Sequence, residues 1–429
     1  MDQAAYQKKV AWFANDRFGM FIHWGLYAIP ARGEWVRSHE RIPAEDYEKF
    51  FEEFNPTDYD PRTWARLAKR AGMRYAVLTA KHHDGFCLFD SKWTDYKATN
   101  TPAGRDLVRE YVEAFRAEGL KVGLYYSLLD WHHPDYPHEK DAHHPMRGNP
   151  AYKDGDRQFS RYVDYLHAQV EELVTGYGRI DLMWFDFSYD HMVGETWRAT
   201  DLVRMIRQHQ PDMLIDNRLE DSTKSSRLHG EPLEYAGDFV CPEQTLPPEG
   251  IFDQKGNRAL WEACITMNNN WGYCHTDHYF KPASMVVRKL VECVSKGGNL
   301  LLNVGPDARG SIPSESVDIL TQVGDWMEKN SQSIYGCGYA DIVKPDYGRV
   351  TRRGNRLYFH VTENTVGLLP ILGVPAEKIV RVRLLATGAE LPIVADFRTA
   401  HYDNVFVKLG DSPLLPDETD TVVLVELKD

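Results

Sequence analysis

The feature that most constrains the fold is a regular alternation of short apolar runs with longer amphipathic stretches over roughly the first 330 residues. The apolar runs are typical of buried strands and lie at 17–23, 75–80, 121–127, 181–187, 213–217, 261–267 and 299–304. The amphipathic stretches predict helices over 60–71, 106–118, 156–175, 196–209, 283–295 and 314–329. Strands that alternate with helices form a parallel sheet. Their number and spacing favour a (β/α)8-like barrel over an open sheet.

The pattern changes near residue 331, after the last expected helix. The remaining chain carries short alternating runs, RLYFHVT, KIVRVRLL, NVFVKL and TVVLVEL, separated by Gly, Pro, Asn and Asp. Such runs predict an antiparallel β-sandwich. The sequence therefore predicts an α/β chain with two domains, a catalytic (β/α)8-like barrel over 1–335 and a C-terminal β-sandwich over 336–429.

The charge balance excludes several classes of partner. Sixty-three acidic residues against fifty basic ones leave a net charge of −13, which disfavours nucleic acid and anionic membranes and suits a neutral substrate. No apolar run approaches the ~20 residues of a membrane span, and the first residues lack the apolar core of a signal peptide. We therefore expect a cytoplasmic protein, or a periplasmic or secreted one from which a leader was removed.

Several catalytic classes lack their motifs. No GxGxxG or GxxxxGK[ST] follows an expected strand, which argues against nucleotide binding. There is no GxSxG, and Cys87 and Cys241 have no evident activating neighbours, so serine or cysteine nucleophiles lack support. The six cysteines form no CxxC pair and are expected to be free thiols.

The ends of the expected strands carry the residues that point to function. Active sites of (β/α)8 barrels lie at this edge of the sheet. Histidines, aromatic residues, carboxylates and an arginine occur there, in the segments FIHWG, KHHDGF, YYS, WFDF, DNR and NNNW. Flat apolar side chains beside fixed polar groups are what a neutral sugar requires.

Asp186 is the most informative of these residues, because it follows the apolar run LMWF, where a charge is otherwise avoided. Alone, it could be an aspartate that caps the following turn. Among so many aromatic residues it favours the nucleophile of a retaining glycosidase, which needs a second carboxyl group ~5–5.5 Å away as general acid. Glu243, on an expected loop in DFVCPEQTLP, fits the role of general acid. From the residues alone, three other glutamates could fill that role: Glu231, Glu234 and Glu262.

A metal site is an alternative interpretation of the histidines. One nominal ligand set is His23, His82, His83 and Asp84, and another is the histidine-rich loop 131–144. Adjacent residues of a strand point to opposite faces, which disfavours the first set. The second set lies in a loop that contains prolines. We therefore expect no metal.

The motifs resemble one family. In chain order, FGMFIHWGLYAIPARGEW, AKHHDGFCLFDSKWTDY, GLYYSLLDW, LMWFDF, DNR, WEACITMNNNWGY and SKGGNLLLNVGPDARGSIP are similar to segments of glycoside hydrolase family 29, the α-L-fucosidases, over about 12–326. The resemblance implies a (β/α)8-like domain, a C-terminal β-sandwich, and hydrolysis with retained configuration and without metal or cofactor. The implied partner is a fucosylated oligosaccharide or glycoconjugate.

The resemblance also implies roles for individual residues. Asp186 takes the place of the nucleophile and Glu243 that of the acid/base. Phe187 stands where the family commonly has glycine, and we expect it to narrow the pocket floor or the neighbouring subsite. The residues implied to bind or surround the sugar are Phe21, His23, Glu34, Trp35, His82, His83, Tyr125, Trp184, Arg218 and Trp271.

The physical character of these residues agrees with a 6-deoxy sugar. Phe21 and Trp271 offer an apolar wall for a methyl group, and the histidines and Glu34 offer partners for hydroxyls. We therefore expect an exo-acting, retaining α-L-fucosidase that works by double displacement. The alternatives are an α-L-galactosidase, because an apolar pocket rejects an added hydroxyl only weakly, a catalytically silent carbohydrate-binding protein, and a metal-dependent hydrolase.

Overall fold

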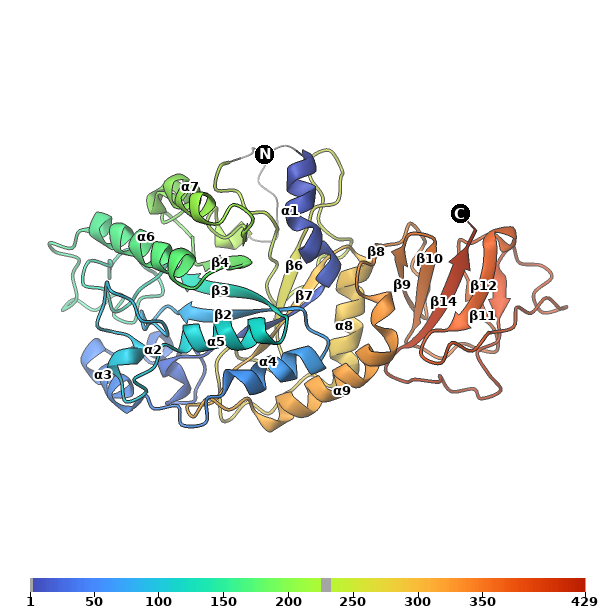
Figure 1. The fold of residues 1–429 in the computed structure, drawn as a ribbon, viewed down its shortest axis with the longest axis horizontal. Helices are drawn as coiled ribbons and strands as arrows, with labels where there is room; N and C mark the ends of the chain where they lie inside the picture. The colour runs from blue at the N-terminus through green and yellow to red at the C-terminus, as the bar shows by residue number, and fades with distance from the viewer. Residues whose placement is uncertain (1–2, 225–232, 429) are drawn as a thin grey trace.

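The computed structural model describes residues 3–224 and 233–428, and its first part is a curled parallel sheet with helices packed around it (Figure 1). The strands lie side by side in the order β5-β4-β3-β2-β1-β7-β6. Their bounds are β1 Phe18–Ile22, β2 Tyr75–Lys81, β3 Lys121–Ser127, β4 Leu182–Asp186, β5 Leu214–Ile215, β6 Glu262–Thr266 and β7 Asn299–Val304. Each strand expected from the sequence is present, and the expected α/β barrel-like fold is confirmed.

The two edges of this sheet meet through an irregular segment, 239–243. It makes isolated parallel bridges to both edges, from Phe239 to Asp216 just after β5 and from Glu243 to Cys264 in β6. The segment contains Pro242, which has no N–H to donate to a regular ladder. It therefore occupies the eighth position of the barrel without forming a regular strand, which explains why no strand was expected there.

Helices cover the outside of the sheet at the positions that the amphipathic pattern indicated. They are α4 Pro61–Arg70, α5 Leu107–Ala117, α6 Phe159–Gly176, α7 Ala199–His209, α8 Ala283–Ser295 and α9 Ser314–Asn330. The described residues also form three helices that were not predicted from the sequence: α1 Gln3–Asp16, α2 Val36–His39 and α3 Ala44–Glu53. In α1, Phe13 packs on Tyr75 and Phe239, so this helix closes the amino end of the barrel.

Alternation along the strands decides which side chains reach the barrel interior. In β4, Leu182 and Trp184 belong to a buried cluster inside the barrel, whereas Met183 and Phe185 pack under the helices. This follows from the two-residue period of a strand. Asp186 continues the inward-facing series and ends the strand, so the same period that buries Trp184 aims the carboxylate into the mouth of the barrel.

The last part of the chain forms antiparallel sheets beside α8 and α9 (Figure 1). One sheet has the order β12-β14-β10-β9-β8 and the other pairs β11 with β13. The bounds are β8 Gly338–Tyr339, β9 Gly348–Arg353, β10 Arg356–Val361, β11 Leu369–Ile371, β12 Ile379–Leu384, β13 Val405–Val407 and β14 Thr421–Leu427. Both sheets contribute to one apolar core, which confirms the sandwich, while the boundary at 335/336 stays a prediction.

The other face of the larger sheet packs against the barrel. Tyr358 and Leu424 join the large core cluster of the first part of the chain, and the Trp326 indole of α9 donates a hydrogen bond to the Asp420 carbonyl. All six cysteines are free thiols. Among the described helices, none combines the length and the apolar character needed to cross a membrane.

Candidate active site

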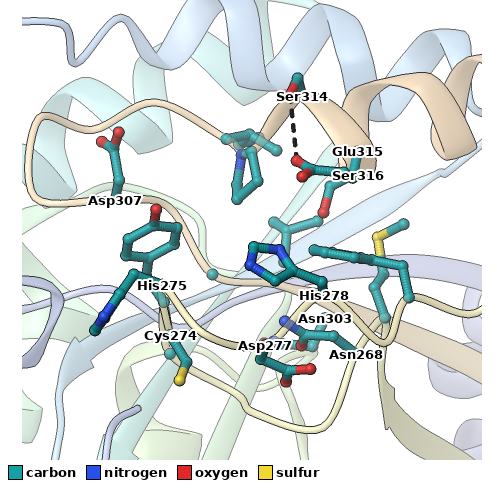
Figure 2. A pocket seen from close by; sticks show the side chains of 18 of the residues that line it. Asn268, Cys274, His275, Asp277, His278, Asn303, Asp307, Ser314, Glu315 and Ser316 are labelled. Carbon is teal, nitrogen blue, oxygen red and sulfur yellow. Dashed lines mark hydrogen bonds between the residues drawn. The ribbon is translucent and has the colours of Figure 1, made fainter. Parts of the chain in front are cut away.

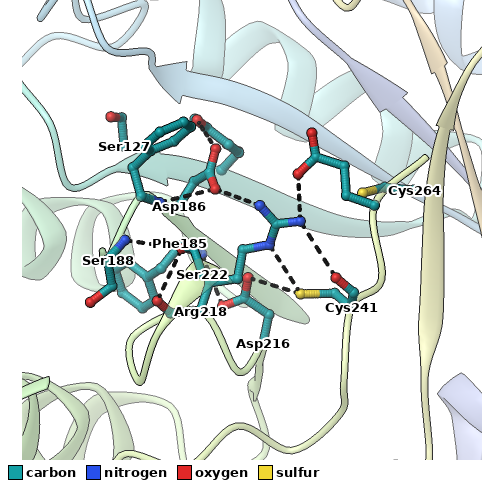
Figure 3. Close-up of polar contacts among 12 residues, drawn as sticks. Ser127, Phe185, Asp186, Ser188, Asp216, Arg218, Ser222, Cys241 and Cys264 are labelled. Atoms are coloured by element: carbon teal, nitrogen blue, oxygen red, sulfur yellow. Dashed lines mark hydrogen bonds and ion pairs between the residues drawn. The ribbon is translucent and has the colours of Figure 1, made fainter. Parts of the chain in front are cut away.

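Two carboxylates meet across one guanidinium at the carboxyl end of the barrel. Arg218 Nη1 donates to Asp186 Oδ1 at 2.7 Å, and Nη2 donates to Glu243 Oε2 at 2.8 Å. Figure 3 shows Arg218 between Asp186 and Cys241, which accepts from the guanidinium through its carbonyl and its sulfur. The guanidinium also lies 4.4 Å from the Trp184 ring. Arg218 is therefore held on every side, and it holds both carboxylates close together.

Asp186 has further partners that favour its ionised form. The Tyr125 hydroxyl donates to Oδ2 at 2.8 Å, and the Phe187 N–H donates to Oδ1 at 3.0 Å. Burial raises the pKa of Asp186, and the Arg218 charge together with the Tyr125 hydrogen bond opposes that rise. A carboxylate with charge-assisted partners and little water around it is suited to act as a nucleophile.

The backbone is strained immediately after each of these carboxylates. Phe187 has φ 69° and Gln244 has φ 51°, both in the left-handed region that favours glycine. Such conformations cost about 1–3 kcal/mol and collect at functional sites. Two of the seven residues other than glycine that have this conformation in the described chain therefore directly follow these carboxylates.

The pocket histidines are neutral and present a hydrogen-bond acceptor. His23 Nδ1 lies 2.6 Å from Asn303 Oδ1, so it carries the proton that the amide oxygen accepts. His83 Nδ1 lies 2.6 Å from Ser127 Oγ, whose own proton goes to the Leu129 carbonyl. Burial lowers the pKa of His23 to about 3 and that of His83 well below its usual value. Each Nε2 is therefore an acceptor suited to a sugar hydroxyl.

Most of the expected residues line one pocket. Its walls are Phe21, His23, Trp35, His82, His83, Tyr125, Trp184, Asp186, Phe187, Glu243, Cys264 and Trp271. Its volume of about 30 Å³ holds roughly two water molecules. Two of its walls, Trp35 and Trp271, are half-buried, so the pocket opens to solvent beside these rings.

Two expected residues lie behind this wall. Glu34 accepts from the backbone N–H groups of Trp271 and Gly272 at 3.1 and 2.8 Å, so it holds the loop that carries Trp271. Arg218 lies beneath the two carboxylates. The sequence analysis missed Cys264, whose buried thiol lines the pocket. Its inward position in β6, two residues after Glu262, was the one signal available for it.

The rival glutamates lie elsewhere, so far as the structure describes them. Glu234 is exposed and paired with Arg204 at 2.6 Å. Glu262 is the first residue of β6 and receives a hydrogen bond from Tyr75, the first residue of β2, so it lies at the amino end of the barrel. Glu231 lies outside the described residues. Among the glutamates that the structure places, Glu243 is the one that lines the pocket.

Glu262 gives a testable dependence of stability on pH. Burial raises its pKa from 4.5 to about 8. The folded state therefore binds this proton more tightly than the unfolded state, and the associated stability is complete below pH 4.5 and is lost as the pH rises through 8. That difference corresponds to roughly 5 kcal/mol of unfolding free energy.

We expect Glu262→Gln, which mimics the protonated acid, to remove this pH dependence. Urea unfolding at pH 5, 6.5 and 8 measures it, with the exposed Glu234→Gln as the matched control. If the unfolding free energy changes equally with pH in wild type and in Glu262→Gln, the buried acid is ionised over this whole pH range.

A roomier cavity of about 270 Å³ lies beside the catalytic pocket, between the segments 267–280 and 303–316 (Figure 2). Asn303 borders it and hydrogen-bonds to His23 and to the Trp271 carbonyl. Its carboxylates are Asp277, Asp307 and Glu315, and no arginine lines it beside them. The side chains of the smaller pocket, and not its volume, therefore make it the candidate active site.

The geometry gives no support to the metal alternative. In the described part of the chain, no group of three or more His, Cys, Asp or Glu side chains converges as metal ligands would. The pocket histidines turn Nδ1 toward Asn303 and Ser127 instead. Carboxylates in a barrel mouth lined by aromatic rings and neutral imidazoles define a glycoside hydrolase site.

Comparison with known proteins identifies the family. The family model for alpha-L-fucosidase matches residues 1–332. Alpha-L-fucosidase of Dictyostelium discoideum is 30% identical over 366 residues, which cover 78% of this chain and 73% of that protein. Tissue alpha-L-fucosidase of Bos taurus is 31% identical over 351 residues, which cover 76% and 68%. The chain belongs to the α-L-fucosidases, glycoside hydrolase family 29.

Solved structures agree over the full length. Alpha-L-fucosidase isoenzyme 1 from Paenibacillus thiaminolyticus is 58% identical and superimposes with a TM-score of 0.96 over 99% of this chain and 100% of that one. A GH29 alpha-L-fucosidase from Bacteroides thetaiotaomicron is 31% identical, with a TM-score of 0.85 over 100% and 97%. That protein was captured as a covalent intermediate in complex with 2-fluoro-fucosyl fluoride.

Proposed function

We propose that the chain hydrolyses terminal α-L-fucose from oligosaccharides or glycoconjugates by an exo-acting, retaining mechanism, with Asp186 as nucleophile and Glu243 as acid/base. The observation that carries the assignment of roles is the pair of carboxylates bound to one guanidinium, because a retaining glycosidase needs its two carboxyl groups ~5–5.5 Å apart. The covalent intermediate of the Bacteroides relative supports the same chemistry.

The reaction follows in two steps from the positions of these groups. Asp186, buried and anchored by Tyr125, attacks the anomeric carbon, while Glu243 donates a proton to the departing oxygen. Glu243 then takes a proton from water, the water oxygen bonds to the anomeric carbon, and the bond to Asp186 breaks. Glu243 is suited to meet both leaving group and water, because 40% of its side chain is exposed against 11% for Asp186.

The pocket walls suit fucose. Phe21 and Trp271 lie 5.9 Å apart between ring centroids and offer an apolar surface for the methyl group. The Nε2 acceptors of His23 and His83 suit donor hydroxyls. An α-L-galactoside carries a hydroxyl in place of a hydrogen on that methyl group, and we expect it to be a poorer substrate rather than an excluded one.

Proton NMR during hydrolysis of 4-nitrophenyl α-L-fucoside tests the proposal. Two inversions at one carbon retain configuration, so we expect α-L-fucose as the first product, before mutarotation. β-L-Fucose at early times would overturn the double displacement. The absence of hydrolysis in a folded sample that still binds fucose would point to the carbohydrate-binding alternative, and activity lost in EDTA and restored by a divalent ion would revive the metal alternative.

A further inference from the structure

We propose that Phe187, together with Trp35 and His143, forms the subsite that receives the leaving group, and that this subsite selects leaving groups with a flat apolar face. The ligand class is an aryl ring, or a sugar ring that presents its C–H face. The proposal rests on the proposed function, because it assumes that Asp186 attacks the sugar.

Phe187 lines the pocket that also holds the nucleophile and the acid/base. It directly follows Asp186, lines the catalytic pocket and is half-buried. Its ring lies 4.7 Å from that of His83, 5.2 Å from Trp35 and 5.4 Å from His143, measured between centroids. Trp35 and His143 are themselves 5.3 Å apart. Three half-buried rings therefore meet in one group at the pocket mouth, and Trp35 and Phe187 form part of the pocket wall.

The buried carboxylate of Asp141 connects the loops that carry these rings. Asp141 is fully buried and accepts hydrogen bonds from the Trp131 indole and the Tyr136 hydroxyl, each at 3.0 Å. Its other oxygen accepts from the Tyr189 hydroxyl and from the backbone N–H of His143. Asp141 thereby joins the loop that carries His143 to the loop that carries Phe187. The two loops are therefore joined before a ligand arrives, which reduces the entropy that binding must overcome.

The conformation of Phe187 argues against a purely structural role. Its φ of 69° would cost less with glycine, and its ring is not fully buried, so packing alone does not explain the side chain. A phenyl ring at this position carries no charge and no hydrogen-bonding group. It can recognise a ligand only by stacking and apolar contact, which sets the chemical class of the leaving group.

Two variants and two substrates test the proposal. Phe187→Gly removes the ring and the backbone strain together, and Phe187→Leu removes the aromatic face while keeping a Cβ. The matched control is Asp190→Gly, which also replaces a left-handed residue (φ 52°) but at an exposed position in the same loop. The substrates are 4-nitrophenyl α-L-fucoside, whose aryl group reaches the subsite, and α-L-fucosyl fluoride, whose leaving group is a single atom.

The readout is the ratio of kcat/KM for the aryl fucoside to kcat/KM for the fluoride. We expect both Phe187 variants to lower this ratio about 3- to 10-fold, the size expected for one aromatic contact, and Asp190→Gly to leave it unchanged. A ratio that stays constant in both Phe187 variants, whether or not the two rates fall together, would overturn the subsite. Wild-type protein that hydrolyses neither substrate would instead overturn the proposed function.

Discussion

Replacing Asp186 with glycine is expected to reduce kcat on 4-nitrophenyl α-L-fucoside by about 10⁴-fold or more, the loss seen when a catalytic nucleophile is removed. Both steps of the reaction pass through this carboxylate. The fold should survive, because Arg218 keeps Glu243 as a partner at 2.8 Å. Circular dichroism and thermal unfolding check that the variant is folded, and Asp186→Asn tests the same role with nearly the same shape.

Covalent trapping adds a direct test of the nucleophile. A 2-deoxy-2-fluoro-fucosyl fluoride should label the wild type once, and peptide mass spectrometry should place the label on Asp186. The Asp186→Gly variant should remain unlabelled. Turnover close to wild type by a homogeneous Asp186→Gly sample, or a label on any other residue, would remove Asp186 from this role.

Replacing Glu243 with alanine should have an effect that depends on the leaving group. A general acid contributes about 10²–10⁴-fold, and it contributes most when the leaving group is poor. We therefore expect a loss in that range for kcat/KM on a fucosylated disaccharide and a much smaller loss on α-L-fucosyl fluoride. Azide should partly restore turnover, because it occupies the vacated space and needs no general base, and it should form α-L-fucosyl azide.

The rival glutamates supply the controls for this experiment. Glu234→Ala removes an exposed partner of Arg204, and Glu262→Ala removes a buried acid at the amino end of the barrel. Glu231→Ala completes the set. We expect none of the three to show azide rescue or dependence on the leaving group. Rescue in one of them, together with its absence in Glu243→Ala, would move the acid/base role to that residue and leave Asp186 in place.

Much of this site could be predicted from the local sequence pattern, because the barrel places the ends of its successive strands at one edge of the sheet. A parallel strand delivers its last inward-facing residue to the same edge as its neighbours, so Phe21, Tyr125 and Asp186 could be expected together from apolar runs and strand ends alone. The three helices that were missed are short or mostly polar, and their apolar residues face surfaces that exist only after folding, such as the barrel end that Phe13 covers.

The sequence by itself determined the order of strands and helices, the two kinds of sheet and the set of side chains at the barrel mouth. These follow from hydrophobic periods of 2 and 3.6 residues, which are local properties of a chain. Only the tertiary structure decided which placed glutamate faces Asp186. Glu243 and Glu262 lie close in the chain, but the irregular segment 239–243 raises Glu243 to the carboxyl end of the sheet, and Glu262 starts β6 at the opposite end. The structure likewise decided the proton position on His23, because Asn303 lies 280 residues away. Such contacts join distant segments, and no local pattern contains them.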